Sequence, residues 1–116
     1  MLLWRLQVLQ MLLAHKVLAE MIGTFSMIFV GTSSIILTEK YPHLFPPILI
    51  PIAWGTIIAI MIMVWSGTSG AHFNPAVTLA FVAAKRLSLT LLPLYWASQL
   101  IGGILAIIAL EGIKKI

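Results

Sequence analysis

The stretch that decides the fold is Ser69-Gly70-Ala71-His72-Phe73-Asn74-Pro75-Ala76-Val77-Thr78, which lies between two strongly apolar segments. Glycine is conformationally permissive and a residue before proline avoids the helical region, so no regular helix runs from Gly67 to Pro75. Asn74 followed by Pro75 is typical of an N-cap and the first residue of a helix. We therefore predict a helix that ends near Ser66, a short extended segment, and a new helix that begins at Pro75.

The composition of the chain is that of a membrane protein. Apolar residues make up 61% of the 116 residues and charged residues only 9%, whereas soluble domains average about 25% charged residues. A spanning helix needs about 20 residues, so three spans and one short helix fill the chain. We predict an all-α membrane protein with three transmembrane helices and one re-entrant half-helix.

The apolar segments place the spans at about 17–37, 47–66 and 90–110, and the half-helix at 75–85. A helix of about ten residues covers roughly 15 Å, which is half of the hydrocarbon core. The half-helix therefore begins near the midplane and leaves the membrane at Lys85 and Arg86. In a bilayer, non-helical backbone at that depth is tolerated only where protein buries it or where it lines a water-filled cavity.

Residues 1–16 are leucine-rich but interrupted by polar side chains. Their apolar part is shorter than the roughly 17 residues that a span requires, so we predict a separate interfacial helix on the cytoplasmic face. A signal peptide is the alternative, and it needs a small-residue cleavage site. Ala14 and Ala19 are the candidates for that site, but the apolar sequence continues past both.

The seven Lys and Arg residues, which give a net charge of +4, are scattered along the chain. They flank the membrane segments instead of forming a nucleic-acid surface, so we expect no nucleic-acid partner. By the positive-inside rule, we expect the N-terminus to lie in the cytoplasm together with four cations: Arg5, Lys16, Lys85 and Arg86. We expect a multi-pass protein of the inner or plasma membrane.

No catalytic or metal-binding pattern is present. The chain has no cysteine, and no nucleophile and base lie at a recognisable spacing. His15, His43 and His72 are far apart in the sequence. We expect a protein that is not an enzyme and that needs no metal ion or cofactor.

Two polar side chains fall inside the predicted spans. A carboxylate within a span is costly and usually faces the bundle interior with a partner. We therefore predict that Glu20 is buried and paired; a position at the headgroup level is the alternative. Gln99 is expected to form an interhelical hydrogen bond, and Tyr95 and Trp96 are interpreted as aromatic anchors at the membrane interface.

The broken helix has a physical consequence for solutes. The N-terminus of the half-helix carries unpaired backbone donors and the positive end of a dipole, which favour water oxygen and disfavour cations and protons. The extended segment that precedes the half-helix has free carbonyl groups, which can accept hydrogen bonds at Gly70, Ala71, His72 and Phe73. The amide of Asn74 adds a donor. This pattern predicts a pore or a carrier site, since broken helices occur in both.

The sequence resembles the aquaporin, or major intrinsic protein, family over about residues 17–113. The resemblance is carried by the ten residues quoted above and by three further patterns: Glu20 with Gly23-Thr24-Phe25, Trp54-Gly55, and Gln99 with Gly102. It implies the N-terminal half of a channel for water and small neutral solutes such as glycerol.

The resemblance also implies roles for single residues. Asn74, Pro75 and Ala76 correspond to the first Asn-Pro-Ala box, in which the asparagine donates to the passing solute. The carbonyl groups of residues 70–73 line the cytoplasmic side of the path. Glu20, His72 and Gln99 support the loop structurally.

Trp54 corresponds to an aromatic wall of the outer selectivity filter, as in the nodulin-26-like group and some bacterial relatives, which pass glycerol as well as water. From its residue type alone, Trp54 is equally an interfacial anchor.

Family members have six spans in two inverted halves, each with an Asn-Pro-Ala box, and this sequence corresponds to one half. We therefore expect that a second half completes the pore, in a homo- or hetero-oligomer with another aquaporin half or a full-length relative. The alternative is a truncated, non-conducting membrane protein or a modulatory subunit of a full-length aquaporin.

Overall fold

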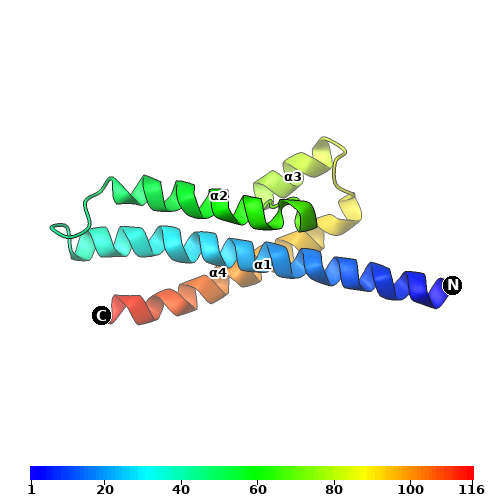
Figure 1. The fold of residues 1–116 in the computed structure, drawn as a ribbon, viewed down its shortest axis with the longest axis horizontal. Helices are drawn as coiled ribbons and strands as arrows, with labels where there is room; N and C mark the ends of the chain where they lie inside the picture. The colour runs from blue at the N-terminus through cyan, green and yellow to red at the C-terminus, as the bar shows by residue number, and fades with distance from the viewer.

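The computed structural model describes all 116 residues, which form helices and connecting coil (Figure 1). The elements are α1 (Leu2–Lys40), α2 (Leu49–Ser69), α3 (Pro75–Ala83), the 3-10 turn η1 (Leu89–Leu91) and α4 (Leu92–Lys114). Three helical segments are long and apolar enough to cross a membrane. The predicted class, an all-α protein with three spanning helices and a short one, is confirmed.

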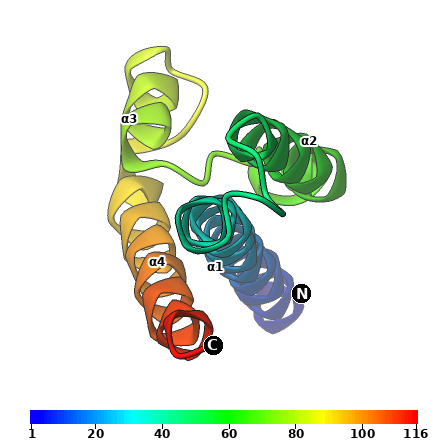
Figure 2. The same cartoon turned by 90° about the vertical axis from the view of Figure 1, so that its left-hand side faces the viewer.

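Helix α1 lies between α2 and α4 when the molecule is viewed along its length (Figure 2). Glycines allow the close contacts on both of its sides. A side chain at Gly102 of α4 would overlap the backbone carbonyl of Met21, and a side chain at Gly31 of α1 would overlap the indole ring of Trp54. Such close approach of helices is the usual way that small residues stabilise packing in membranes.

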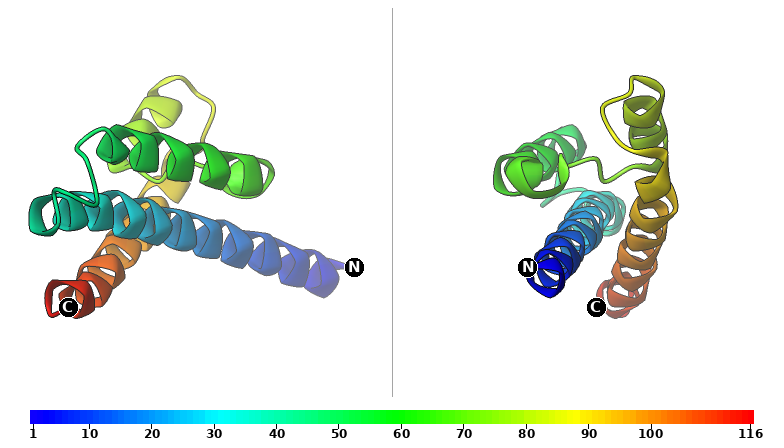
Figure 3. Two further views of the ribbon diagram at one scale, coloured as in Figure 1. Left: turned by 60° about the vertical axis from the view of Figure 1, so that its left-hand side comes forward. Right: turned by 90° about the vertical axis from the view of Figure 1, so that its right-hand side faces the viewer.

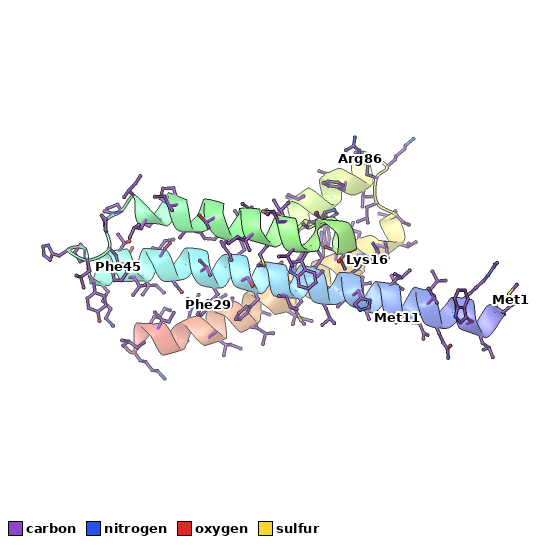
Figure 4. The ribbon with its side chains drawn as sticks, in the orientation of Figure 1. Met1, Met11, Lys16, Phe29, Phe45 and Arg86 are labelled. Atoms are coloured by element: carbon purple, nitrogen blue, oxygen red, sulfur yellow. The ribbon has the colours of Figure 1, made fainter.

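Helix α1 continues without interruption through residues 1–16, which corrects the prediction of a separate N-terminal helix. Its 39 residues correspond to about 58 Å, close to the 62 Å of the longest molecular axis. No glycine or proline occurs before Gly23, so nothing in the sequence stops the helix at residue 16. The N-terminal part of α1 projects beyond the other helices (Figure 4). All of the first 15 residues except Val8 are exposed.

Helix α2 ends at Ser69, three residues beyond the predicted end at Ser66. Gly67 is accommodated within the helix, and Gly70 ends it in the left-handed conformation with φ 91°, which is the common glycine C-cap. Coil follows, and α3 begins at Pro75 as the sequence predicts. Helix α3 ends at Ala83, two residues before the predicted end, where Lys85 adopts φ 58°.

The coil of residues 70–74 passes from α2 to α3 (Figure 3) and runs inward along α1. At its beginning, Lys16 Nζ donates to the carbonyl oxygen of Thr68 at 3.2 Å. Further along, the Phe73 ring lies against Gly23, and Asn74 shares a groove with Met27. From Lys16 to Met27, α1 rises about 16 Å, or half of a hydrocarbon core.

Helix α3 then returns toward the end at which the coil began. Figure 4 shows Arg86 at the same level along the long axis as Lys16. The coil and α3 together therefore form a re-entrant segment, and Asn74 lies at its innermost point. This is the geometry that positions the candidate site.

Candidate functional site

Glu20 is fully buried and holds the middle of the coil. Its Oε1 accepts hydrogen bonds from Ser69 Oγ at 2.7 Å and from the backbone N–H of His72 at 3.0 Å. Its Oε2 accepts from the backbone N–H of Phe73 at 2.7 Å and from Gln99 Nε2 at 2.9 Å. A carboxylate has about four acceptor positions, so one side chain of α1 is saturated by donors from α2, the coil and α4.

Thr78 of α3 is, after Glu20, the second side chain at which hydrogen bonds from several elements meet, and it too is fully buried. Its Oγ1 lies 3.1 Å from His72 Nδ1 and accepts from Gln99 Nε2 at 2.9 Å. The same hydroxyl donates to the carbonyl oxygen of Asn74 at 3.2 Å. Gln99 therefore joins Glu20 and Thr78 through a single amide nitrogen.

The His72 ring packs between two aromatic side chains. Its centroid lies 4.4 Å from that of Phe81 and 5.1 Å from that of Tyr95. His72 is buried, and it lines neither of the two larger grooves of the chain. Its imidazole therefore acts on the coil through packing and through Thr78.

Asn74 caps α3 from an extended conformation, with φ −153° and ψ 127°. Its Oδ1 accepts from the backbone N–H of Ala76 at 2.9 Å, which is the usual N-cap bond. This orientation leaves the Nδ2 group of Asn74 without a partner in the chain. Asn74, Pro75 and Ala76 are exposed, so both the free amide and the positive end of α3 face outward from the bundle.

The backbone of the coil is divided into an inward and an outward side. The N–H groups of Ala71, His72 and Phe73 bond to Ser69 Oγ and to Glu20. In a planar trans peptide the preceding carbonyl points the opposite way. The carbonyl groups of Ala71 and His72 therefore point away from Glu20, and that of Gly70 points away from Ser69 Oγ. These carbonyls and that of Phe73 accept no hydrogen bond within the chain.

Two non-glycine residues carry the strain of this arrangement. Ala71 and Phe73 both adopt φ 54°, a left-handed conformation that costs an L-residue on the order of 1–3 kcal/mol. The hydrogen bonds of the His72 and Phe73 N–H groups to Glu20 help to offset this cost. The coil therefore holds a conformation that it would not keep in isolation.

A groove of about 380 Å³ lies beside Asn74, between α1 and α4. Most of its wall is apolar, and the polar residues that line it are Thr24, Asn74 and Gln99. A larger groove of about 510 Å³ lies between α1 and α2 and is mainly aliphatic and aromatic. Asn74 contributes only to the first.

Trp54 of α2 is placed apart from the coil. Its indole covers Gly31 of α1, which is four residues, or about 6 Å, beyond Met27. The indole therefore lies farther from the Lys16 end of the molecule than Asn74 does. It is half-buried in the contact between α1 and α2 and lines neither of the two larger grooves.

The interpretation of Tyr95 and Trp96 as interface anchors missed their contacts with the coil. Tyr95 is buried, and its hydroxyl donates to the carbonyl oxygen of Ser69 at 2.6 Å. Trp96 is partly exposed, yet its Nε1 donates to the carbonyl oxygen of Pro75 at 3.0 Å. One feature of the sequence could have indicated that Tyr95 is buried. Tyr95 lies four residues before Gln99 and therefore shares its face of α4.

Residues 7–116 match the family described as Major intrinsic protein. The chain belongs to the major intrinsic protein family. Aquaporin NIP3-1 of Arabidopsis thaliana is 41% identical over 95 residues, which cover 79% of this chain and 28% of that protein. Nodulin-26 of Glycine max is 40% identical over 92 residues, which cover 79% of this chain and 34% of that protein.

Putative aquaporin NIP4-1 of Arabidopsis thaliana is 38% identical over 106 residues, or 90% of this chain and 37% of that protein. The chain thus spans about a third of the length of the curated relatives it matches. Members of the major intrinsic protein family are channels and not enzymes. With three helices able to cross a bilayer, the chain is a multi-pass membrane protein of a channel family.

Proposed function

We propose that this major intrinsic protein chain forms one half of a passive channel for water and small neutral solutes. The observation that carries the proposal is the arrangement at Asn74. A free amide donor at the N-terminus of α3 adjoins four carbonyl groups that accept no hydrogen bond within the chain. Such a line of donors and acceptors replaces the hydration of a neutral solute as it crosses an apolar region.

The charges of the coil favour neutral solutes over cations. The N-terminus of α3 presents the positive end of a helix dipole beside Asn74. Water or a polyol accepts a hydrogen bond from Asn74 Nδ2 and donates to the coil carbonyls. A cation meets the same carbonyls but is repelled at the N-terminus of α3, and an Asn amide presents its nitrogen only as a donor.

A second half completes the path in this proposal. Residues 74–77, at the start of α3, are exposed in the chain, and unpaired backbone donors facing hydrocarbon are costly. A second half of opposite orientation, from another copy or from a full-length aquaporin, would cover the groove of about 380 Å³ and separate Asn74 from lipid.

The orientation and the solute complete the proposal. We propose that the N-terminus lies on the cytoplasmic side of the inner or plasma membrane, which the positive-inside rule supports through Arg5, Lys16, Lys85 and Arg86. Trp54, which lies beyond Asn74 along α1, is proposed as a wall of the outer filter. Glycerol is proposed among the solutes because Trp54 resembles the filter residue of the nodulin-26-like group.

The proposal is tested by stopped-flow light scattering on liposomes that contain the purified chain. With the chain alone, we expect osmotic shrinkage faster than that of protein-free liposomes. If the chain needs a full-length aquaporin, we expect liposomes that contain both to shrink faster than liposomes that contain only the full-length channel. Shrinkage equal to the corresponding controls in both cases, with insertion verified by protease protection, would contradict the proposal. Co-purification with a full-length aquaporin without added flux would favour the modulatory subunit instead.

A further inference from the structure

We propose that Tyr95 and Trp96 form a clamp that holds both ends of the coil 70–74 and thereby positions the groups that face the solute. They are positioning residues, because neither donates to the proposed path itself. The inference rests on the proposed function for what the coil does. The contacts that define the clamp are independent of that function.

The clamp consists of two adjacent residues on one helix that reach opposite ends of the coil. The Tyr95 hydroxyl donates to Ser69, the last residue of α2, at 2.6 Å. The Trp96 indole N–H donates to Pro75, the first residue of α3, at 3.0 Å. Successive residues of an α-helix are fixed at a rise of 1.5 Å, so α4 sets the separation between the two ends.

The first end of the coil is also restrained by a side chain, because Ser69 Oγ donates to Glu20 at 2.7 Å. The carbonyl group of Ser69 has no other partner in the chain than Tyr95. Glu20 holds the N–H groups of His72 and Phe73 in the middle of the coil, but its carboxylate contacts neither of the end carbonyls. The clamp bonds thus come from α4, whereas the bonds to Glu20 hold the coil to α1.

The conformation of the coil requires restraint from several sides. Ala71 and Phe73 both adopt φ 54°, and a strained backbone persists only where its surroundings over-determine it. Releasing one end allows these residues to relax toward negative φ. Relaxation turns the carbonyl groups away from the proposed path and loosens the bonds of the His72 and Phe73 N–H groups to Glu20, while the helices remain.

Two conservative substitutions remove the clamp bonds: Tyr95→Phe keeps the phenyl ring, and Trp96→Phe keeps an aromatic ring that is smaller than the indole. The chain offers matched controls. Trp65→Phe removes a buried indole N–H that has no hydrogen-bond partner. Tyr41→Phe removes a hydroxyl whose contact, at 3.4 Å to Ile116, lies at the opposite end of α1.

The first readout is hydrogen exchange by mass spectrometry on peptides that cover residues 70–74. We expect either clamp variant to raise the exchange rate of these amides roughly tenfold, the change given by one lost hydrogen bond. We expect the two control variants to match the wild type. Exchange in the clamp variants that equals the controls would overturn the proposal.

The second readout is the ratio of glycerol to water permeability in liposomes. Because both fluxes scale with the amount of folded protein, a variant that only folds less well leaves the ratio unchanged. We expect the clamp variants to shift the ratio several-fold and the double variant to add little more, since both bonds hold one segment. An unchanged ratio in conducting liposomes would overturn the clamp. If the wild type conducts neither solute, alone or with a full-length aquaporin, the proposed function fails and hydrogen exchange alone decides the clamp.

Discussion

Gln99 of α4 donates to Glu20 of α1 across 2.9 Å, although the two residues are 79 positions apart in the sequence. The same amide nitrogen donates to Thr78 of α3. Glu20 in turn accepts the N–H groups of the coil. This buried pair therefore connects two of the three spanning helices, α1 and α4, with the coil and the half-helix. The geometry at Asn74 thus depends on residues that do not touch a solute.

The first prediction concerns the charge at this junction. Glu20→Gln replaces one carboxylate oxygen by an NH₂ group, so two of the four donors around it lose their acceptor. At about 1–3 kcal/mol for each unsatisfied buried donor, we expect a loss of about 2–6 kcal/mol in the free energy of unfolding. Unfolding in detergent micelles, followed by circular dichroism, measures this loss.

Glu39→Gln is the matched control, because Glu39 is exposed in the last turn of α1. Its stability should remain within about 0.5 kcal/mol of the wild type, as for most surface substitutions. Equal stabilities of the two variants would show that the Glu20 junction does not hold the structure together.

The second prediction concerns the contact between α1 and the coil. A Cβ at position 23 would overlap the Phe73 ring, so we expect Gly23→Ala to displace the coil and to destabilise the protein by about 1–3 kcal/mol. Gly112→Ala meets no atom within 4 Å and should be neutral or stabilising by up to about 1 kcal/mol. Equilibrium unfolding of both variants checks the difference, and a Gly23→Ala protein as stable as Gly112→Ala would refute it.

The third prediction separates two roles of Asn74. Asn74→Asp keeps an oxygen that accepts from Ala76, so the cap of α3 remains, but it removes the Nδ2 donor and adds a negative charge. Asn74→Ala removes both the cap and the donor, and loss of the cap costs about 0.5–2 kcal/mol. We expect water permeability to fall in both variants, but stability to fall clearly only in Asn74→Ala. Wild-type permeability of Asn74→Asp would exclude the amide as a solute contact.

Local chemistry explains why the break in the helix could be predicted. Gly70, Asn74 and Pro75 each determine their own backbone conformation, so the C-cap, the coil and the N-cap follow from residue type. The end of α2 was misplaced by three residues because Gly67 is tolerated within a helix and only Gly70 needs the left-handed conformation.

Tertiary contacts explain what the sequence did not reveal. Hydropathy measures the preference for lipid and not the continuity of a helix, so the polar residues before Val17 suggested a boundary that α1 does not have. An aromatic residue near the start of a span suits the membrane interface or the bundle interior equally well. The hydroxyl of Tyr95 finds Ser69 only once α2 and α4 are packed on α1.

The central claim is that the N-terminus of α3 faces water inside the membrane. Because the chain has no cysteine, single-cysteine variants in liposomes test this claim directly with a small water-soluble thiol reagent. Ala76→Cys probes the first turn of α3. Leu105→Cys is the control, since Leu105 is exposed on α4 between two residues of the groove but does not line it.

We predict that the thiol of Ala76→Cys is modified many times faster than that of Leu105→Cys, and that glycerol at high concentration slows the first reaction only. If the two thiols react equally slowly, the first turn of α3 faces lipid, and the proposed path past Asn74 does not exist.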